Sequence, residues 1–140
     1  MQQNMSENKI YKFLYNKKYL VVSALVTYWL VLIVGTSLPS TSLPSFKVGD
    51  KVIHFIAYFG LGLLFATYRL IYFKNIKQNI IFVILLIAAY ALIDEVHQIF
   101  IPGRYCELFD FLADVTGGAI GLGLAYLILI KKWGKTVVQK

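Results

Sequence analysis

Residues 80–101 read IIFVILLIAAYALIDEVHQIFI, and this stretch decides the class of fold. No residue from Ile80 to Ile93 is charged. The segment is long enough to cross the roughly 30 Å hydrocarbon core of a bilayer as a helix that rises ~1.5 Å per residue. In lipid, only a helix or a closed barrel satisfies its own backbone hydrogen bonds. The stretch therefore predicts a transmembrane helix, which carries two carboxylates, Asp94 and Glu95, toward one end.

Three further apolar segments have similar lengths, at residues 19–38, 51–73 and 109–130. The chain as a whole is 59% hydrophobic and 15% charged, whereas a soluble domain has about 25% charged residues. We therefore expect an all-α fold, an integral membrane bundle of four helices. The expected division is a cytoplasmic N-terminal segment at 1–18, a transmembrane domain at 19–130 and a basic cytoplasmic tail at 131–140.

The basic residues predict the orientation, because loops on the cytoplasmic side carry an excess of Lys and Arg. With a cytoplasmic N-terminus, eleven of the 14 basic residues lie inside, and only Lys47, Lys51 and Arg104 lie outside. Both termini are thus predicted to be cytoplasmic. The net charge of +7 does not indicate nucleic-acid binding, because the basic residues lie at the ends of apolar runs and lack any binding fold around them.

Helical spacing places the acidic residues of the last three segments on shared polar faces. These faces comprise Asp50, Lys51, His54 and Tyr58; Tyr90, Asp94, His97 and Gln98, with Glu95 just beyond; and Asp110 and Asp114, followed by the small residues Gly117, Gly121 and Ala125. A charged side chain costs ~2.5–3.5 kcal/mol at the centre of a membrane helix, so we expect the faces to meet in a polar pocket that opens outward. The Gly117-x-x-x-Gly121 spacing also allows a neighbouring helix to approach closely.

The joint Phe100-Ile101-Pro102-Gly103-Arg104 is expected to end the third helix sharply, because proline cannot continue it and glycine permits the turn. This turn would hold Arg104 over the acidic cluster, where a guanidinium suits a carboxylate or a phosphate. A different role stays open: an ion pair from Lys51 or Arg104 to Asp94 or Glu95 would merely lock the bundle.

Taken together, these motifs resemble the VanZ-like family, named for a protein associated with teicoplanin resistance. The matching stretches are Asp50-Lys51-x-x-His54-Phe55-x-x-Tyr58, Asp94-Glu95-x-x-Gln98-x-Phe100-x-Pro102-Gly103-Arg104 and Asp110-x-x-x-Asp114-x-x-Gly117-Gly118-x-x-Gly121. Family members often have Asn where this chain has Asp114. The resemblance implies a small, multi-helix protein of the bacterial cell envelope, here a multi-pass protein of the inner (cytoplasmic) membrane. It implies no settled reaction.

The functional hypothesis is a pocket that recognises a polar or anionic envelope component, with a link to glycopeptide resistance. That component is a lipid head group, a peptidoglycan precursor or a glycopeptide antibiotic, and the lipid bilayer is the other expected partner. The expected ligand-binding residues are Lys51, His54, Tyr58, Asp94, Glu95, Gln98, Arg104, Asp110 and Asp114. The expected structural residues are Pro102, Gly103, Gly117, Gly118 and Gly121. The oligomeric state stays open.

The alternative is a membrane enzyme acting on a lipid-linked phosphate, in which Glu95, Asp94 and His54 would supply acid–base chemistry. Transport is disfavoured, because the inner halves of the third and fourth segments are almost wholly apolar. We expect no cofactor and no metal site. The chain has no His-x-x-x-His motif and no Cys pair, and the positive neighbours Lys51 and Arg104 oppose a cation.

Overall fold

The computed structural model describes residues 8–42 and 49–130, and all regular elements in these ranges are helical. They are α2 (Lys9–Asn16), α3 (Lys18–Ser37), the short 3-10 helix η1 (Ser40–Ser42), α4 (Asp50–Tyr72), α5 (Ile76–Gln98) and α6 (Leu108–Leu129). The helices α3, α4, α5 and α6 are each long and apolar enough to cross a membrane. The prediction of an all-α membrane bundle with four spans is therefore confirmed. The orientation of the bundle in the membrane stays a prediction.

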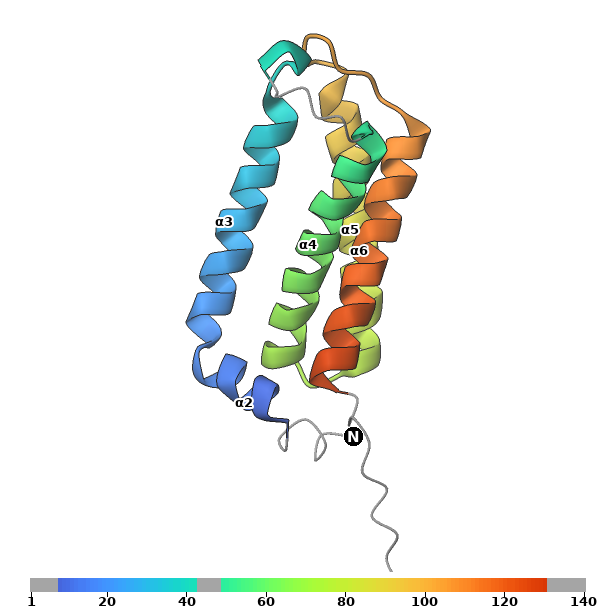
Figure 1. Cartoon of the computed structure of the whole chain (residues 1–140). Coiled ribbons are helices and arrows are strands. Elements are labelled where there is room, and N and C mark those ends of the chain that lie inside the picture. Colours follow the sequence, from blue (N-terminus) through green and yellow to red (C-terminus); the bar gives the residue numbers. More distant parts are fainter. Residues whose placement is uncertain (1–7, 43–48, 131–140) are drawn as a thin grey trace, which may run out of the picture.

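The end of α5 lies three residues before the predicted end of the span, and its hydrogen bonds explain why. The N–H groups of Ile99, Phe100 and Ile101 each donate to the carbonyl three residues earlier, at 3.3, 3.0 and 3.0 Å. Such bonds tighten the last turn and satisfy carbonyls that have no partner within the α-helix. The tightened turn leads directly into Pro102, and the chain then crosses to α6 (Figure 1).

The short amphipathic helix α2 lies across the foot of the bundle, and the sequence analysis did not predict it (Figure 1). Asn8 joins this helix to the last one. Its side-chain oxygen accepts hydrogen bonds from the N–H groups of Ile10 and Tyr11 at 2.9 and 3.2 Å, which caps the start of α2. Its side-chain amide donates to the carbonyl of Ile128 at 2.7 Å, at the end of α6. One side chain thus satisfies two helix ends.

Helices α4 and α6 make the closest packing in the bundle, and glycines allow it. A Cβ atom added at Gly117 would collide with the carbonyl oxygen of Phe55, and one added at Gly121 would collide with the carbonyl oxygen of Phe59. Because the obstructing atoms belong to the backbone of α4, only a residue without a side chain fits at these positions. This contact fixes the depth at which the polar residues of the two helices face each other.

Helix α3 lies to one side of this pair and is attached mainly through aromatic side chains (Figure 1). The ring of Trp29 packs edge-on against Phe65 and Tyr90, with centroids 6.3 and 5.4 Å apart. The hydroxyl of Tyr28 donates to the carbonyl of Ala57 at 2.9 Å. The two buried residues of α3, Val21 and Leu25, lie in the half nearer α2, whereas residues of its other half line a cavity beside α4.

The middle of the bundle is apolar, and its polar groups gather at the ends. The buried residues between α4, α5 and α6 include Leu61, Ala66, Leu70, Val83, Ile87, Leu122 and Ala125. At the end near α2, the guanidinium of Arg69 stacks on the rings of Phe73 and Phe82, 3.7 and 4.4 Å from their centroids. Arg69 therefore does not continue the polar faces of the other end through the bundle.

Candidate functional site

A cavity of about 540 Å³ lies at the end of the bundle where α3 ends and α4 begins. Its walls come from α3, η1, α4, the end of α5, the connection between α5 and α6, and the first turn of α6. The lining residues are Val31, Leu32, Gly35, Thr36, Ser40, Asp50, Ile53, His54, Ala57, Tyr58, Gln98, Gly103, Arg104, Tyr105, Glu107 and Asp110. The lining combines apolar side chains with polar and charged ones, so the cavity can receive a group that is itself amphipathic.

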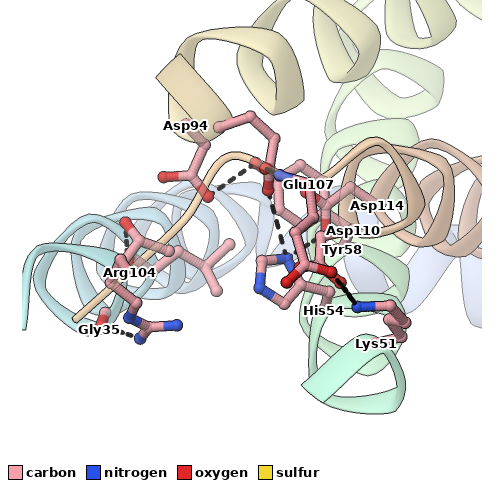
Figure 2. Close-up of polar contacts among 12 residues, drawn as sticks. Gly35, Lys51, His54, Tyr58, Asp94, Arg104, Glu107, Asp110 and Asp114 are labelled. Atoms are coloured by element: carbon pink, nitrogen blue, oxygen red, sulfur yellow. Dashed lines mark hydrogen bonds and ion pairs between the residues drawn. The ribbon is translucent and has the colours of Figure 1, made fainter. Parts of the chain in front are cut away.

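His54 links this cavity to a set of buried carboxylates. The Nδ1 atom of its ring lies 3.0 Å from Oδ1 of Asp114 and 4.0 Å from Oε1 of Glu95 (Figure 2). The three residues come from α4, α6 and α5, and they are 6%, 0% and 1% exposed. A carboxylate bonded to one ring nitrogen fixes the orientation of an imidazole, as in enzymes that use histidine as a general base. The arrangement can therefore hold or move a proton beside the cavity.

Lys51 forms ion pairs with a different pair of carboxylates at the mouth of the site. Its ammonium lies 2.7 Å from Oε2 of Glu107 and 3.0 Å from Oδ1 of Asp110 (Figure 2). Lys51 is therefore not an ion-pair partner of Asp94 or Glu95 in this structure, so the alternative left open by the sequence has no support for Lys51. It also does not line the cavity, so its expected contact with a ligand has no support from the geometry.

The turn between α5 and α6 places Arg104 differently from expectation. Gly103 has a φ of 75°, which glycine adopts without strain. The guanidinium of Arg104 donates to the carbonyls of Leu38 and Gly35 at 3.5 and 3.4 Å, at the end of α3. Among residues 8–42 and 49–130, no carboxylate lies within ion-pair distance of it. Arg104 thus does not lie over the acidic cluster, because the turn places its guanidinium at the end of α3, on the other side of the cavity.

Asp94 lies behind the cavity and accepts a hydrogen bond from Tyr58. The hydroxyl of Tyr58 donates to its Oδ2 at 3.2 Å, and the ring of Tyr58 stacks on Tyr90 with centroids 5.8 Å apart. Both Asp94 and Tyr58 are buried. This bond connects α4 to α5 and satisfies one of the carboxylate's acceptor sites, which lowers the penalty for burying it.

Apart from Lys51, the predicted ligand-binding residues divide into two groups by position. His54, Tyr58, Gln98, Arg104 and Asp110 line the cavity. Asp94, Glu95 and Asp114 lie behind it, with exposed fractions of 4%, 1% and 0%. A molecule in the cavity would meet the first group directly and the second group only through His54 or other intervening side chains.

Glu107 is the residue that the sequence analysis missed. It lines the cavity, pairs with Lys51 and donates its backbone N–H to Oε2 of Glu95 at 2.8 Å. Glu95, which its spacing places just outside the polar face of α5, is fully buried and accepts this bond, whereas His97 on that face is partly exposed. The signal in the sequence was only that Glu107 directly precedes an apolar helix, as capping residues do.

The comparisons with known proteins agree with the motifs. The family model described as VanZ/LLP1 matches residues 2–130. The comparisons with curated proteins and with solved structures each give no match. The matched range covers nearly the whole chain and includes all the residues of the site described above. The resemblance drawn from the sequence motifs is thereby confirmed, and the chain belongs to the VanZ/LLP1 family.

Proposed function

We propose that the cavity binds the polar head group of an amphiphilic component of the bacterial cell envelope. The observation that carries this proposal is the mixed apolar and polar lining of the cavity. Val31, Leu32, Ile53 and Ala57 contribute apolar surface to the lining, and Asp50, His54, Gln98, Arg104, Glu107 and Asp110 contribute polar groups, with Arg104 held at the end of α3. A lipid or a lipid-linked precursor presents the same combination of an apolar chain and a polar head.

The size of the cavity narrows the class of ligand. Pockets of 300–1,000 Å³ typically hold small molecules, and the cavity of about 540 Å³ falls in that range. A lipid head group, or the polar end of a lipid-linked peptidoglycan precursor, suits such a volume. A whole glycopeptide antibiotic exceeds it, so we propose that any link to glycopeptide resistance runs through an envelope ligand rather than through capture of the drug in this cavity.

The charges of the lining favour a head group that carries both an anionic group and hydrogen-bond donors. Arg104 binds carbonyls at 3.4–3.5 Å, and such long bonds can be exchanged for bonds to a phosphate. Across the cavity, the carboxylate of Asp50 and the second oxygens of Glu107 and Asp110, whose first oxygens bind Lys51, would accept bonds from an ammonium or from hydroxyl groups. The proposed ligand is therefore zwitterionic or hydroxylated rather than purely anionic.

The proposed location of the cavity follows from the basic residues. Lys17, Lys18 and Arg69 lie at the end that carries α2, and the cavity lies at the other end (Figure 1). By the positive-inside rule, we propose that the cavity opens on the outer side of the bacterial inner membrane, with both termini and the 1–18 and 131–140 segments in the cytoplasm. There it would meet lipids of the outer leaflet and exported precursors.

Two glycines provide a matched pair of variants for testing ligand binding. A Cβ atom at Gly35, beside the cavity, meets nothing within 4 Å, and the same is true of Gly123 on the exposed face of α6. Gly35→Trp should obstruct the cavity, and Gly123→Trp should not. The protein, purified in micelles, would be supplied with phosphatidylethanolamine, phosphatidylglycerol and an isoprenoid pyrophosphate, and bound molecules would be counted by native mass spectrometry.

The proposal expects one retained lipid per chain in the parent and in Gly123→Trp, and its loss in Gly35→Trp. Retention of phosphatidylethanolamine over phosphatidylglycerol would support the charge argument. Equal retention by all three proteins would mean that the lipid binds the outer surface of the bundle, and the proposal would fail.

A second candidate function rests on the bond between His54 and Asp114. An imidazole oriented by a carboxylate and facing a cavity can act as a general base, and a phosphate held by Arg104 would lie across from it. In this reading the protein hydrolyses a lipid-linked phosphate. Release of phosphate from an isoprenoid pyrophosphate by the parent, lost in His54→Gln but kept in His97→Gln, would favour the enzyme over the binding protein.

A further inference from the structure

Three side chains from three helices bring possible metal ligands together behind the cavity. A ring nitrogen of His54 and one carboxylate oxygen each of Glu95 and Asp114 lie within 4.8 Å of one another. The two distances from His54 Nδ1 are 3.0 and 4.0 Å. Bonds from zinc to nitrogen and oxygen are about 2.0–2.2 Å long, so two ligand atoms on one ion lie roughly 3–4 Å apart. The spacing of the three groups is therefore compatible with one shared ion.

Two of these carboxylates also keep an oxygen without a partner. Oε1 of Glu95 and Oδ2 of Asp114 are buried and accept no hydrogen bond from the described part of the chain. The other oxygen of Glu95 accepts the N–H of Glu107, and the other oxygen of Asp114 faces His54. Buried acceptors are nearly always satisfied, because leaving one unpaired costs free energy. Each orphaned oxygen thus lacks a partner among the described residues, and an ion bound between the two carboxylates would supply one.

The charge around the cluster leads to the same conclusion. The expectation of no metal rested on the lack of a His-x-x-x-His motif or a Cys pair and on Lys51 and Arg104 as positive neighbours. In the structure, Lys51 is bound to Glu107 and Asp110, and Arg104 to backbone carbonyls. Neither cation contacts Glu95 or Asp114 within residues 8–42 and 49–130. Among the described residues, Glu95 and Asp114, with exposed fractions of 1% and 0%, therefore have no Lys or Arg within ion-pair distance. Buried charges are normally paired or bound to metal.

We propose that His54, Glu95 and Asp114 bind one divalent transition-metal ion, such as Zn²⁺. One imidazole with two carboxylates is a donor set that zinc accepts, and three protein ligands leave a position for water or for an oxygen of a bound molecule. A second group, His54 with Asp50 and Asp110, is also close together, but Asp50 is exposed and Asp110 already binds Lys51. This inference does not depend on the ligand proposed above.

The two histidines of the chain allow a controlled test of this site. His54 belongs to the cluster, whereas His97 lies on the same end of the bundle and is only partly buried. Tag-free protein with Cys106→Ser, stripped of metal in micelles, would be titrated with Zn²⁺ by calorimetry. We expect one saturable equivalent in the parent and in His97→Gln. We expect at least about tenfold weaker binding in His54→Gln and Asp114→Asn, since changes to outer-shell groups alone cost that much.

The parent protein alone decides the outcome if a variant fails to fold. Co²⁺ at the site should give visible absorption bands of a low-coordinate nitrogen and oxygen site, and Zn²⁺ should raise the melting temperature of the parent. Absence of saturable Zn²⁺ binding in the parent would overturn the proposal. So would a loss of binding in His97→Gln equal to that in His54→Gln, because it would assign the metal to exposed side chains. Asp50→Asn should leave the affinity unchanged, and a loss there would assign the ion to the second group instead.

Discussion

Replacing Gly121 with alanine adds one methyl group at the point where α6 meets the backbone of α4. The added Cβ would collide with the carbonyl oxygen of Phe59 and would lie 2.8 Å from the amide nitrogen of Leu63. Real Cβ contacts are essentially never that short, and backbone atoms cannot move aside as the end of a flexible side chain can. The two helices must therefore separate, and every contact along their interface loosens.

The cost of overpacking can be separated from the intrinsic effect of replacing glycine with alanine in a helix. Gly123 lies on the same helix but faces outward, and a Cβ there meets nothing within 4 Å. Exchanging glycine for alanine inside a helix gains up to about 1 kcal/mol at either position. Overpacking costs roughly 1–3 kcal/mol at Gly121 only. The free energies of unfolding of the two variants should thus differ by about 1–3 kcal/mol. This difference corresponds to a factor between roughly five and more than a hundred in the ratio of folded to unfolded protein.

The measurement is an unfolding titration with sodium dodecyl sulfate in mild micelles. Fluorescence of Trp29 would follow it, in a Trp133→Phe background, because Trp29 packs between Phe65 and Tyr90 and reports the separation of α3 from its neighbours. Gly121→Ala should unfold at a lower detergent fraction than the parent, and Gly123→Ala at the same or a higher fraction. Equal midpoints for the two variants would refute the close backbone contact between α4 and α6.

Three other predictions test the orientation, the end of the bundle near α2 and the polar cluster. Cysteines placed at Ser42 and at Thr136 in a Cys106→Ser background should differ in their labelling, because an impermeant reagent should reach only position 42 in intact cells. Labelling at position 136 would contradict the predicted orientation. Asn8→Ala removes the cap of α2 and a bond to α6, and should lower the free energy of unfolding by about 0.5–2 kcal/mol; an unchanged value would show that the cap is dispensable. Tyr58→Phe leaves a buried carboxylate without its donor and should cost about 1–3 kcal/mol in the same titration, whereas no cost would mean that water replaces the hydroxyl.

Much of the fold follows from hydropathy, because the bilayer imposes one length and one kind of backbone structure on each span. The ranges 19–38, 51–73, 80–101 and 109–130 differ from the observed helices by at most four residues at an end. Hydropathy did not predict the helix α2. It is short and lies at the edge of the bundle, so neither span length nor a long apolar run marks it, and its position depends on a cap by Asn8 that also contacts α6.

The site was predictable where it depends on spacing within one helix, and unpredictable where it depends on a connection. His54 and Tyr58 share a face of α4 because they are four residues apart, and both line the cavity. The partners of Lys51, by contrast, are contributed by a chain segment more than fifty positions away, at Glu107 and Asp110. Helical periodicity does not state how the connection between α5 and α6 returns over the bundle, so the positions of Arg104 and Glu107 required the structure.

The most direct measurement of the central claim, that the cavity holds an envelope amphiphile, is photocrosslinking in living cells. Leu32 lines the cavity, and Leu127 is exposed on the outer face of α6. A diazirine analogue of leucine has nearly the same shape, so that its insertion at either position leaves the packing intact. After irradiation, mass spectrometry of the purified chain would identify what is attached. We expect one dominant species with a zwitterionic or hydroxylated head group at position 32, and a mixture that mirrors the bulk lipids at position 127. The same bulk mixture at both positions would contradict the account.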